Sequence, residues 1–193
     1  MEPGVAGAGE ALRIPATIAA GRGIELRPIS VEHAAALYAL IDRNRVRLRE
    51  WLPWVGQSFG PDDLNTFIKD RERDNVDGVS LTTAIFADGE ICGVVALHTI
   101  NRRDRNTSVG YWLDSGYGGR GIMTQACQAI VTEGFRRYGL HRIEIRCATG
   151  NAKSGAIARR LGFVEEGILQ EAEWLYDHWV DLRVFGMLER QWK

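Results

Sequence analysis

The sequence predicts an α+β fold in which a mixed sheet carries helices on both of its faces. Short segments with the apolar alternation of strands recur along the chain, and helical patterns separate only some of them. This order differs from the regular strand–helix repeat of a doubly wound sheet. The longest helical pattern, at 122–138, has an apolar stripe so broad that it must be buried against a sheet.

The first half of the chain is predicted to supply a strand, two helices and a hairpin. Residues 24–29 alternate and contain a proline, which suits an edge strand. Ser30 is the cap of a helix whose apolar residues follow helical spacing, and Gly60 opens a second helix. Residues 81–86 and 91–97 are predicted to be strands joined by a tight turn.

The second half is predicted to contain four strands and two helices. The strands are 107–113, 142–147, 163–169 and 180–188, and the helices are 122–138 and 151–161. Gly162 stops the second of these helices. We therefore expect one sheet of about seven strands.

Size and charge indicate one ordinary globular domain. The chain has 193 residues, of which 45% are hydrophobic and 25% charged, enough for a substantial core. The 24 Lys and Arg residues nearly balance the 25 Asp and Glu residues, so no global basic field favours nucleic acid as a partner. Residues 1–22, rich in Gly and Ala, are predicted to be a flexible arm, and 23–193 the single domain.

The three cysteines predict neither disulfides nor a metal site. Cys92, Cys127 and Cys147 are widely spaced, lie in apolar runs and show no Cys-x-x-Cys spacing. They are typical of core residues in a reduced, cytoplasmic protein. No apolar run approaches the roughly 20 residues that span a bilayer, and the N-terminus lacks the basic cluster of a secretory signal. We expect no membrane partner and no metal.

A glycine-rich turn at 116–121 is the strongest local signal for a ligand. It lies between an apolar strand and the helix 122–138. Glycines let backbone N–H groups approach a ligand without obstruction by Cβ. At the start of a helix these N–H groups are unpaired donors at the positive end of the helix dipole, an arrangement that binds phosphate.

The turn alone leaves several interpretations open. A P-loop needs a Gly-Lys pair, which the sequence lacks. The dinucleotide pattern Gly-x-Gly-x-x-Gly does occur at 116–121, but no clean parallel strand with an acidic ribose ligand follows it. A tight strand-to-helix turn without any ligand explains the glycines equally well.

A second motif decides between these interpretations. Asn151, Ser154 and the run Leu161-Gly162-Phe163 follow about thirty residues after the turn. The pair of motifs resembles the GNAT acetyltransferase superfamily, in which Gln/Arg-x-x-Gly-x-Gly/Ala binds the pyrophosphate of acetyl-CoA and Asn-x-x-Ser and Leu-Gly-Phe follow. The resemblance covers 24–193 and includes 167–173, which is similar to the RimL/RimJ branch that acetylates protein N-termini.

The resemblance implies a GNAT fold and an enzyme that uses acetyl-CoA. An acetyl group would pass directly to a primary amine in a ternary complex, with a protein N-terminal α-amine as the best candidate acceptor and a homodimer as the expected assembly. Alternatives within the same class are polyamine, antibiotic or aminoacyl-nucleotide acceptors, and succinyl-CoA as donor. Alternatives from other classes are a non-catalytic acyl-CoA-binding regulatory domain and a dinucleotide enzyme.

The resemblance also assigns roles to individual residues. The backbone of the turn would hold the pyrophosphate, through Gly119, Arg120, Gly121, Ile122 and Met123. Trp112 and Leu113 would lie beside the pantetheine arm, and Asn151 would bind it. Ser154 would be the acid for the departing thiolate, and Glu173 the general base. The alternatives are helix capping for Asn151 and Ser154, and an exposed carboxylate in an acidic run for Glu173.

Two positions depart from the family pattern. Gly118 stands where the superfamily usually has Gln or Arg, so one side-chain contact to phosphate is lost, and Arg120 is the candidate to replace it. Ser108 stands where relatives often have Glu, which removes an alternative base.

Four more residues are predicted to line the acceptor site. Trp51 and Trp54 flank a proline in the loop after the first helix and are candidates for the wall of an amine groove, with coverage of the core edge as the alternative. His98 and Tyr176 are expected to be structural or substrate-lining residues.

Overall fold

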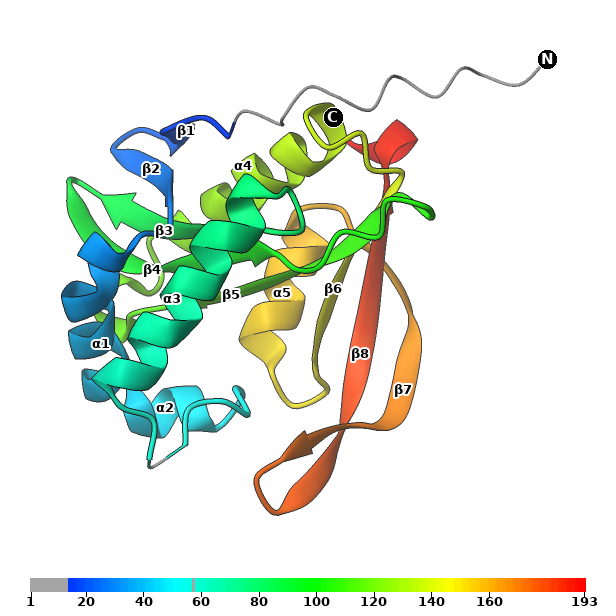
Figure 1. Cartoon of the computed structure of the whole chain (residues 1–193). Helices are drawn as coiled ribbons and strands as arrows, with labels where there is room; N and C mark the ends of the chain where they lie inside the picture. The colour runs from blue at the N-terminus through cyan, green and yellow to red at the C-terminus, as the bar shows by residue number, and fades with distance from the viewer. Residues whose placement is uncertain (1–13, 57) are drawn as a thin grey trace.

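A single mixed sheet organises the chain. The computed structural model describes residues 14–56 and 58–193, and in this part of the chain eight strands follow the order β1-β2-β3-β4-β5-β6-β8-β7 (Figure 1). The strands are β1 Ile18–Gly21, β2 Ile24–Pro28, β3 Leu81–Ala87, β4 Glu90–Leu97, β5 Asn106–Leu113, β6 Arg142–Ala148, β7 Val164–Leu175 and β8 His178–Leu188. Neighbouring strands are antiparallel except for the parallel pair β5 and β6.

Helices cover both faces of the sheet, as predicted. They are α1 Ala34–Arg43, α2 Arg45–Arg49, α3 Pro61–Val76, α4 Ile122–Arg136 and α5 Ala152–Arg160, with short 3-10 turns η1 Val31–His33, η2 Ser115–Tyr117 and η3 Glu189–Gln191. One buried cluster joins α4 and α5 to the sheet, and a second cluster joins α1 and α3 to its other face. No helix in the described residues is long and apolar enough to cross a membrane.

The structure corrects the predicted strands at both ends of the chain. Ile18–Gly21, inside the predicted arm 1–22, forms β1, because Ile18 pairs opposite Leu26 and is only 7% exposed. The sheet therefore has one strand more than expected, and residues 1–13 of the arm lie outside the described residues. β7 and β8 are also longer than predicted. The prediction relied on apolar alternation, and most of β7 is solvent-exposed and lacks this pattern.

The parallel strands β5 and β6 separate along their length. They pair only from Asn106 opposite Arg142 to Val109 opposite Ile145. Beyond this point β5 stays paired with β4 on its other side, and β6 stays paired with β8. The two strands thus diverge toward their carboxyl ends, where the glycine turn follows β5 and α5 follows β6.

Backbone direction along β5 determines which groups face this opening. The amide of His98 donates to the carbonyl of Ser108, and the amide of Asp114 donates to the carbonyl of Cys92. Backbone groups alternate in direction along a strand, so even-numbered residues of β5 bond to β4. Tyr111 and Leu113 consequently direct their backbone groups toward the opening.

Candidate active site

The glycine turn ends in an uncapped helix terminus. Gly119 and Gly121 have φ of +76° and +75°, values that side chains rarely tolerate. A Cβ built on Gly119 would meet no atom within 4 Å, so the turn borders open space. No side chain caps α4, and its first backbone bond is donated by Gln125. The amides of residues 122–124 are therefore donors at the positive end of the helix, suited to an anion.

The arginines near this turn have different partners. Arg120 forms an ion pair with Asp88 at 3.3 Å, and its guanidinium lies 5.3 Å from the ring centre of Tyr117. Arg160, in the last turn of α5, donates instead to the hydroxyl of Thr124 at 2.8 Å. Sequence reasoning selected Arg120 as the residue that compensates for Gly118 and did not consider Arg160.

The start of α5 places Asn151 and Ser154 at the opening between the strands. The Asn151 side-chain oxygen accepts a hydrogen bond from the Ser154 amide at 3.1 Å and so caps the helix. The Ser154 hydroxyl lies 2.9 Å from the Tyr111 hydroxyl, which reaches across from β5. The capping interpretation is thus correct for Asn151, and capping leaves its side-chain NH₂ and the Ser154 hydroxyl able to contact a ligand.

Tyr111 is a further candidate for the site, and sequence reasoning assigned its side chain no role. Burial raises the pKa of its phenol, so the group stays protonated at neutral pH. Burial also raises the pKa of the Cys147 thiol, and a hydrogen bond from the Ser154 hydroxyl offsets part of this rise. Ser154 therefore lies between two neutral groups and belongs to a chain of possible proton donors.

Trp112, predicted to lie beside the pantetheine arm, faces away from the opening. Its side chain is 9% exposed in the second core cluster, and its backbone faces β4.

A buried polar cluster fixes the end of β5 just before the glycine turn. Asn44 is 4% exposed, donates to Asp114 at 2.6 Å and accepts from the Ser115 amide at 3.0 Å. Arg43 adds an ion pair to Asp114 at 2.5 Å, and Arg47 donates to the carbonyl of Leu113. Burial opposes ionisation of Asp114, but hydrogen bonds from Arg43 and Asn44 outweigh it and lower the pKa of the carboxyl.

Removing Asn44 should therefore destabilise the fold. Asn44→Ala leaves the Asp114 carboxylate and the Ser115 amide short of a partner in a buried place, which should lower the free energy of unfolding by about 2–3 kcal/mol. Urea denaturation measures this difference. Asn101 also makes two side-chain hydrogen bonds, at 2.8 and 2.9 Å, but is exposed, so Asn101→Ala is the matched control. Equal losses in the two variants would contradict the role of the buried cluster.

The loop after α2 and the tip of the β7–β8 hairpin are joined by direct contacts. The Tyr176 hydroxyl donates to the carbonyl of Leu52 at 2.5 Å, and the Arg49 guanidinium lies 4.4 Å from the Tyr176 ring centre. Trp51 packs on Gly150, where a Cβ would lie 3.6 Å from its ring. The structure thus brings Trp51 and Tyr176 to one region.

The other two predicted acceptor residues lie apart from these contacts. Trp54 packs edge-on against Phe59, with ring centres 5.4 Å apart. Part of His98 is exposed, but its ring lies against Gly110, where a Cβ would come within 2.2 Å of a ring nitrogen. Burial among its neighbours and the charge of Arg71 lower the pKa of His98, so this imidazole is neutral at neutral pH.

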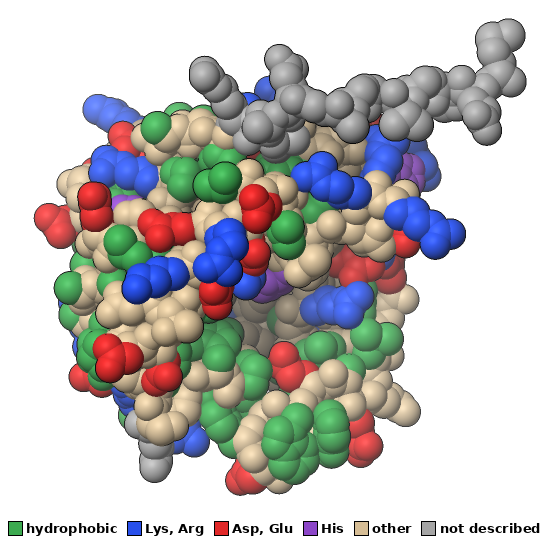
Figure 2. All heavy atoms as spheres, viewed as in Figure 1, with side chains coloured by type: hydrophobic (Ala, Val, Ile, Leu, Met, Phe, Trp, Pro, Cys, Tyr) green, Lys and Arg blue, Asp and Glu red, His purple; other side chains and the backbone are tan. Residues whose placement is uncertain are grey.

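A cavity of about 390 Å³ opens between the loop after α2, the end of β6 and the hairpin. Its lining residues are Glu50, Trp51, Ala148, Thr149, Gly150, Glu171, Leu175, His178, Trp179, Val180 and Asp181. The described residues of this lining include three carboxylates but no Lys or Arg, so the cavity favours a positively charged group. Figure 2 shows that this face of the molecule is hollowed near its centre, with hydrophobic, acidic and basic side chains around the hollow.

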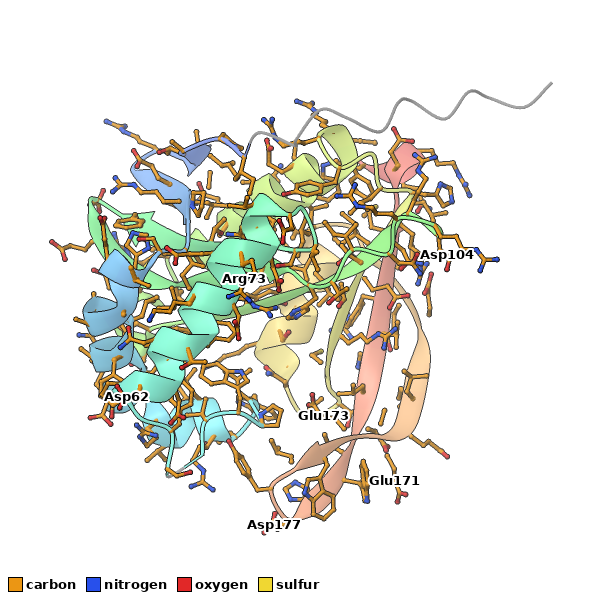
Figure 3. All side chains as sticks on the ribbon, viewed as in Figure 1. Asp62, Arg73, Asp104, Glu171, Glu173 and Asp177 are labelled. Atoms are coloured by element: carbon orange, nitrogen blue, oxygen red, sulfur yellow. The ribbon has the colours of Figure 1, made fainter. Side chains whose placement is uncertain are left out.

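Glu173 points from the hairpin toward the interior of the molecule, whereas Asp177 lies at the outer tip of the hairpin (Figure 3). The register of β7 shifts between Leu169 and Glu173, and the Glu171 amide donates to Asp181 at 2.8 Å within this irregularity. A bulge of this kind changes the direction of the side chains that follow it. Glu173 then shares a face of the hairpin with Val180 and Leu175, two residues of the cavity lining.

Partial burial gives Glu173 the electrostatics of a base. Burial raises the pKa of its carboxyl, and no charged neighbour among the described residues contributes to the shift. A carboxylate without an ion-pair partner is available to accept a proton, and a raised pKa makes the transfer more favourable. Glu173 is half-buried, in contrast to the exposed residues that precede it in the acidic run.

The raised pKa of Glu173 predicts a pH-dependent gain in stability when its charge is removed. A carboxyl whose pKa is higher in the folded state contributes stability at low pH that is lost as pH rises through the folded pKa. Glu173→Gln removes this loss. The variant should therefore gain more free energy of unfolding over the unaltered protein near pH 7, where Glu173 is ionised, than near pH 4. Urea denaturation at both pH values tests this, and a difference independent of pH would contradict it.

The fold and the site together define an enzyme that transfers an acyl group from coenzyme A to an amine. The family model for the acetyltransferase (GNAT) domain matches residues 24–164, and the chain belongs to this family. Membership confirms the predicted fold and cofactor, acetyl-CoA, and the activity class of N-acetyltransferase. It also excludes the alternative prediction of a dinucleotide-binding enzyme.

Individual relatives are similar over nearly their whole length. The putative ribosomal N-acetyltransferase YdaF of Bacillus subtilis (strain 168) is 32% identical, with 88% of this chain and 93% of the relative covered. The ribosomal-protein-serine acetyltransferase of Escherichia coli (strain K12) is 30% identical, with 89% and 96% covered.

Solved structures of relatives carry the same cofactor. RimL, a ribosomal L7/L12 α-N-protein acetyltransferase in complex with coenzyme A, superposes with a TM-score of 0.86 at 29% identity, with 89% of this chain and 97% of that chain covered. The microcin C7 self-immunity acetyltransferase MccE, in complex with acetyl-CoA and AMP, gives 0.85 at 30% identity, with 92% and 98% covered.

The geometry of this chain fits coenzyme A. The open glycine turn and the uncapped amides of α4 suit its pyrophosphate. The opening between β5 and β6 offers unpaired backbone groups, as an extended pantetheine arm requires. The described residues contain no group of His, Cys, Asp or Glu side chains arranged to hold a metal ion.

Proposed function

We propose that this enzyme acetylates the N-terminal α-amine of a protein by direct transfer within a ternary complex. The observation that carries the proposal is the position of Glu173, which is half-buried without an ion-pair partner beside an acidic cavity near the end of the strand opening. The names of the relatives YdaF, RimL and the ribosomal-protein-serine acetyltransferase support the choice of acceptor.

In the proposed mechanism the acidic cavity attracts the acceptor as an ammonium ion. Glu173, ionised above its raised pKa, takes a proton from this ammonium directly or through a water, which frees the nitrogen lone pair. Acetyl-CoA supplies the acetyl group as a thioester. The Leu113 amide, which faces the opening, donates to the thioester oxygen as negative charge develops there.

Ser154 completes the proposed transfer. The new C–N bond forms as the C–S bond breaks, and the sulfur leaves with the electron pair of that bond. The Ser154 hydroxyl donates a proton to this thiolate, Tyr111, 2.9 Å away, is placed to return one to Ser154, and Tyr111 regains its proton from solvent. The second proton of the attacking nitrogen passes to solvent, and Glu173 releases its own proton there after the transfer. Because the nitrogen attacks the thioester directly, no covalent intermediate with the enzyme forms.

A thiol-release assay with a panel of acceptors tests the proposed acceptor. Acetyl-CoA and succinyl-CoA are each paired with N-terminal peptides, with the same peptides blocked at the α-amine, and with polyamines and aminoacyl nucleotides. We expect the highest kcat/KM for free N-terminal peptides with acetyl-CoA. Turnover of small amines alone would overturn the proposed acceptor, and no turnover of any amine would indicate a binding domain.

We also propose that the enzyme is a cytoplasmic homodimer. Cys92, Cys127 and Cys147 are buried and free, which supports a reducing compartment. The edge strand β7 exposes Val164, Ile168 and Leu169 by 43–52%, and a second copy covering this edge would remove an aggregation hazard. Light scattering of the purified protein distinguishes a dimer from a monomer.

A further inference from the structure

We propose that Arg160 supplies the side-chain contact to the coenzyme A pyrophosphate that Gly118 is unable to make. Gly118 stands at the family position usually occupied by Gln or Arg, at the end of η2. The proposal rests on the acetyl-CoA site and not on the proposed acceptor. It concerns which side chain of this particular chain completes that site.

The position of Arg160 is fixed by its contact with the first turn of α4. Its Nη1 donates to Thr124 Oγ1 at 2.8 Å. Thr124 is the third residue of α4, and its own amide is one of the uncapped donors of this terminus. The guanidinium of Arg160 is therefore anchored within one residue of the backbone groups that form the anion site.

The charge of Arg160 is available to an anion. Arg160 is exposed and forms no ion pair with any carboxylate in the part of the chain that the structure describes. Its bond to Thr124 uses one N–H of a guanidinium that has five, and a neutral hydroxyl leaves the charge uncompensated. The planar remainder of the group is suited to paired hydrogen bonds with phosphate oxygens.

The neighbouring arginines are already paired. Arg120, the residue that the sequence suggested, is engaged by Asp88 at 3.3 Å. Arg159 forms an ion pair with Glu165 at 2.8 Å, and its guanidinium lies 5.2 Å from the Phe185 ring centre. Of the three arginines, Arg160 alone combines a contact to the first turn of α4 with an uncompensated charge.

Cofactor affinity tests the proposal without any acceptor. Calorimetry measures the Kd of coenzyme A and of 3′-dephospho-coenzyme A for the full chain and for Arg160→Gln. Loss of a hydrogen bond between charged groups should weaken both ligands by about 10-fold, and Arg160→Lys should restore part of the affinity. Arg159→Gln is the matched control and should bind within about twofold of the unaltered chain.

Two results would overturn the proposal. Unchanged affinity of Arg160→Gln for both ligands would show that the pyrophosphate needs no such contact. A loss for coenzyme A that is absent with 3′-dephospho-coenzyme A would move the contact to the 3′-phosphate. Thr124→Val, which keeps the side-chain volume but removes the anchor, provides a second measurement and should weaken both ligands by a smaller factor than Arg160→Gln.

Discussion

Glu173→Gln should lower kcat by about 10²–10⁴-fold, the range for loss of a general base. The amide has nearly the same shape as the carboxylate but does not accept a proton from the acceptor ammonium. Because Glu173 lies on the hairpin and the cofactor is bound by the glycine turn, the Kd of acetyl-CoA should stay the same. Thiol release at saturating concentrations measures kcat, and calorimetry measures the Kd.

The pH profile separates a base from a residue that only shapes the site. In the unaltered enzyme kcat should fall as pH decreases through the raised pKa of Glu173, and this acid limb should be absent in Glu173→Gln. Asp177→Asn is the control, because Asp177 lies on the same hairpin but is exposed and points outward. If kcat of Glu173→Gln stays within twofold of the unaltered enzyme, the base is another group or water.

The parts of the site that could be predicted from sequence depend on local geometry. Glycines at 119 and 121 are required by left-handed backbone angles inside one turn, and Asn151 caps a helix through a residue three positions away. Such constraints involve only a few neighbouring residues, so a short sequence motif is enough to predict them.

The contacts that sequence reasoning missed join residues that are far apart in the chain. Tyr111 and Ser154 are 43 positions apart, Asn44 and Asp114 are 70 apart, and Arg160 and Thr124 are 36 apart. Each depends on how the strands and helices pack, and no periodicity of the sequence encodes that packing.

Glu173 is intermediate between these cases. Its place in the family motif indicated a base, but its half-burial follows from the irregularity of β7 between Leu169 and Glu173. A bulge in an exposed edge strand has no sequence signal comparable to a glycine turn, because one extra residue only shifts which side chains face inward. Because most of β7 is exposed, the apolar pattern also predicted a strand shorter than the observed one.

Gly119→Val should abolish most cofactor binding while leaving the fold intact. A Cβ at this position meets no protein atom within 4 Å, so the new side chain would project into the space that the pyrophosphate needs. Loss of two charge-assisted hydrogen bonds of about 1.5 kcal/mol each corresponds to about 100-fold weaker binding. Calorimetry with acetyl-CoA measures the change.

The backbone strain of this substitution needs its own control, because φ of +76° at Gly119 also costs stability once a side chain is present, by about 1–2 kcal/mol. Gly139 has φ of +60° and likewise no atom within 4 Å of a built Cβ, but it follows the opposite end of α4. Gly139→Val should therefore lose similar stability in urea yet keep its affinity for acetyl-CoA. Equal weakening in the two variants would mean that strain, and not obstruction of the pyrophosphate, is responsible.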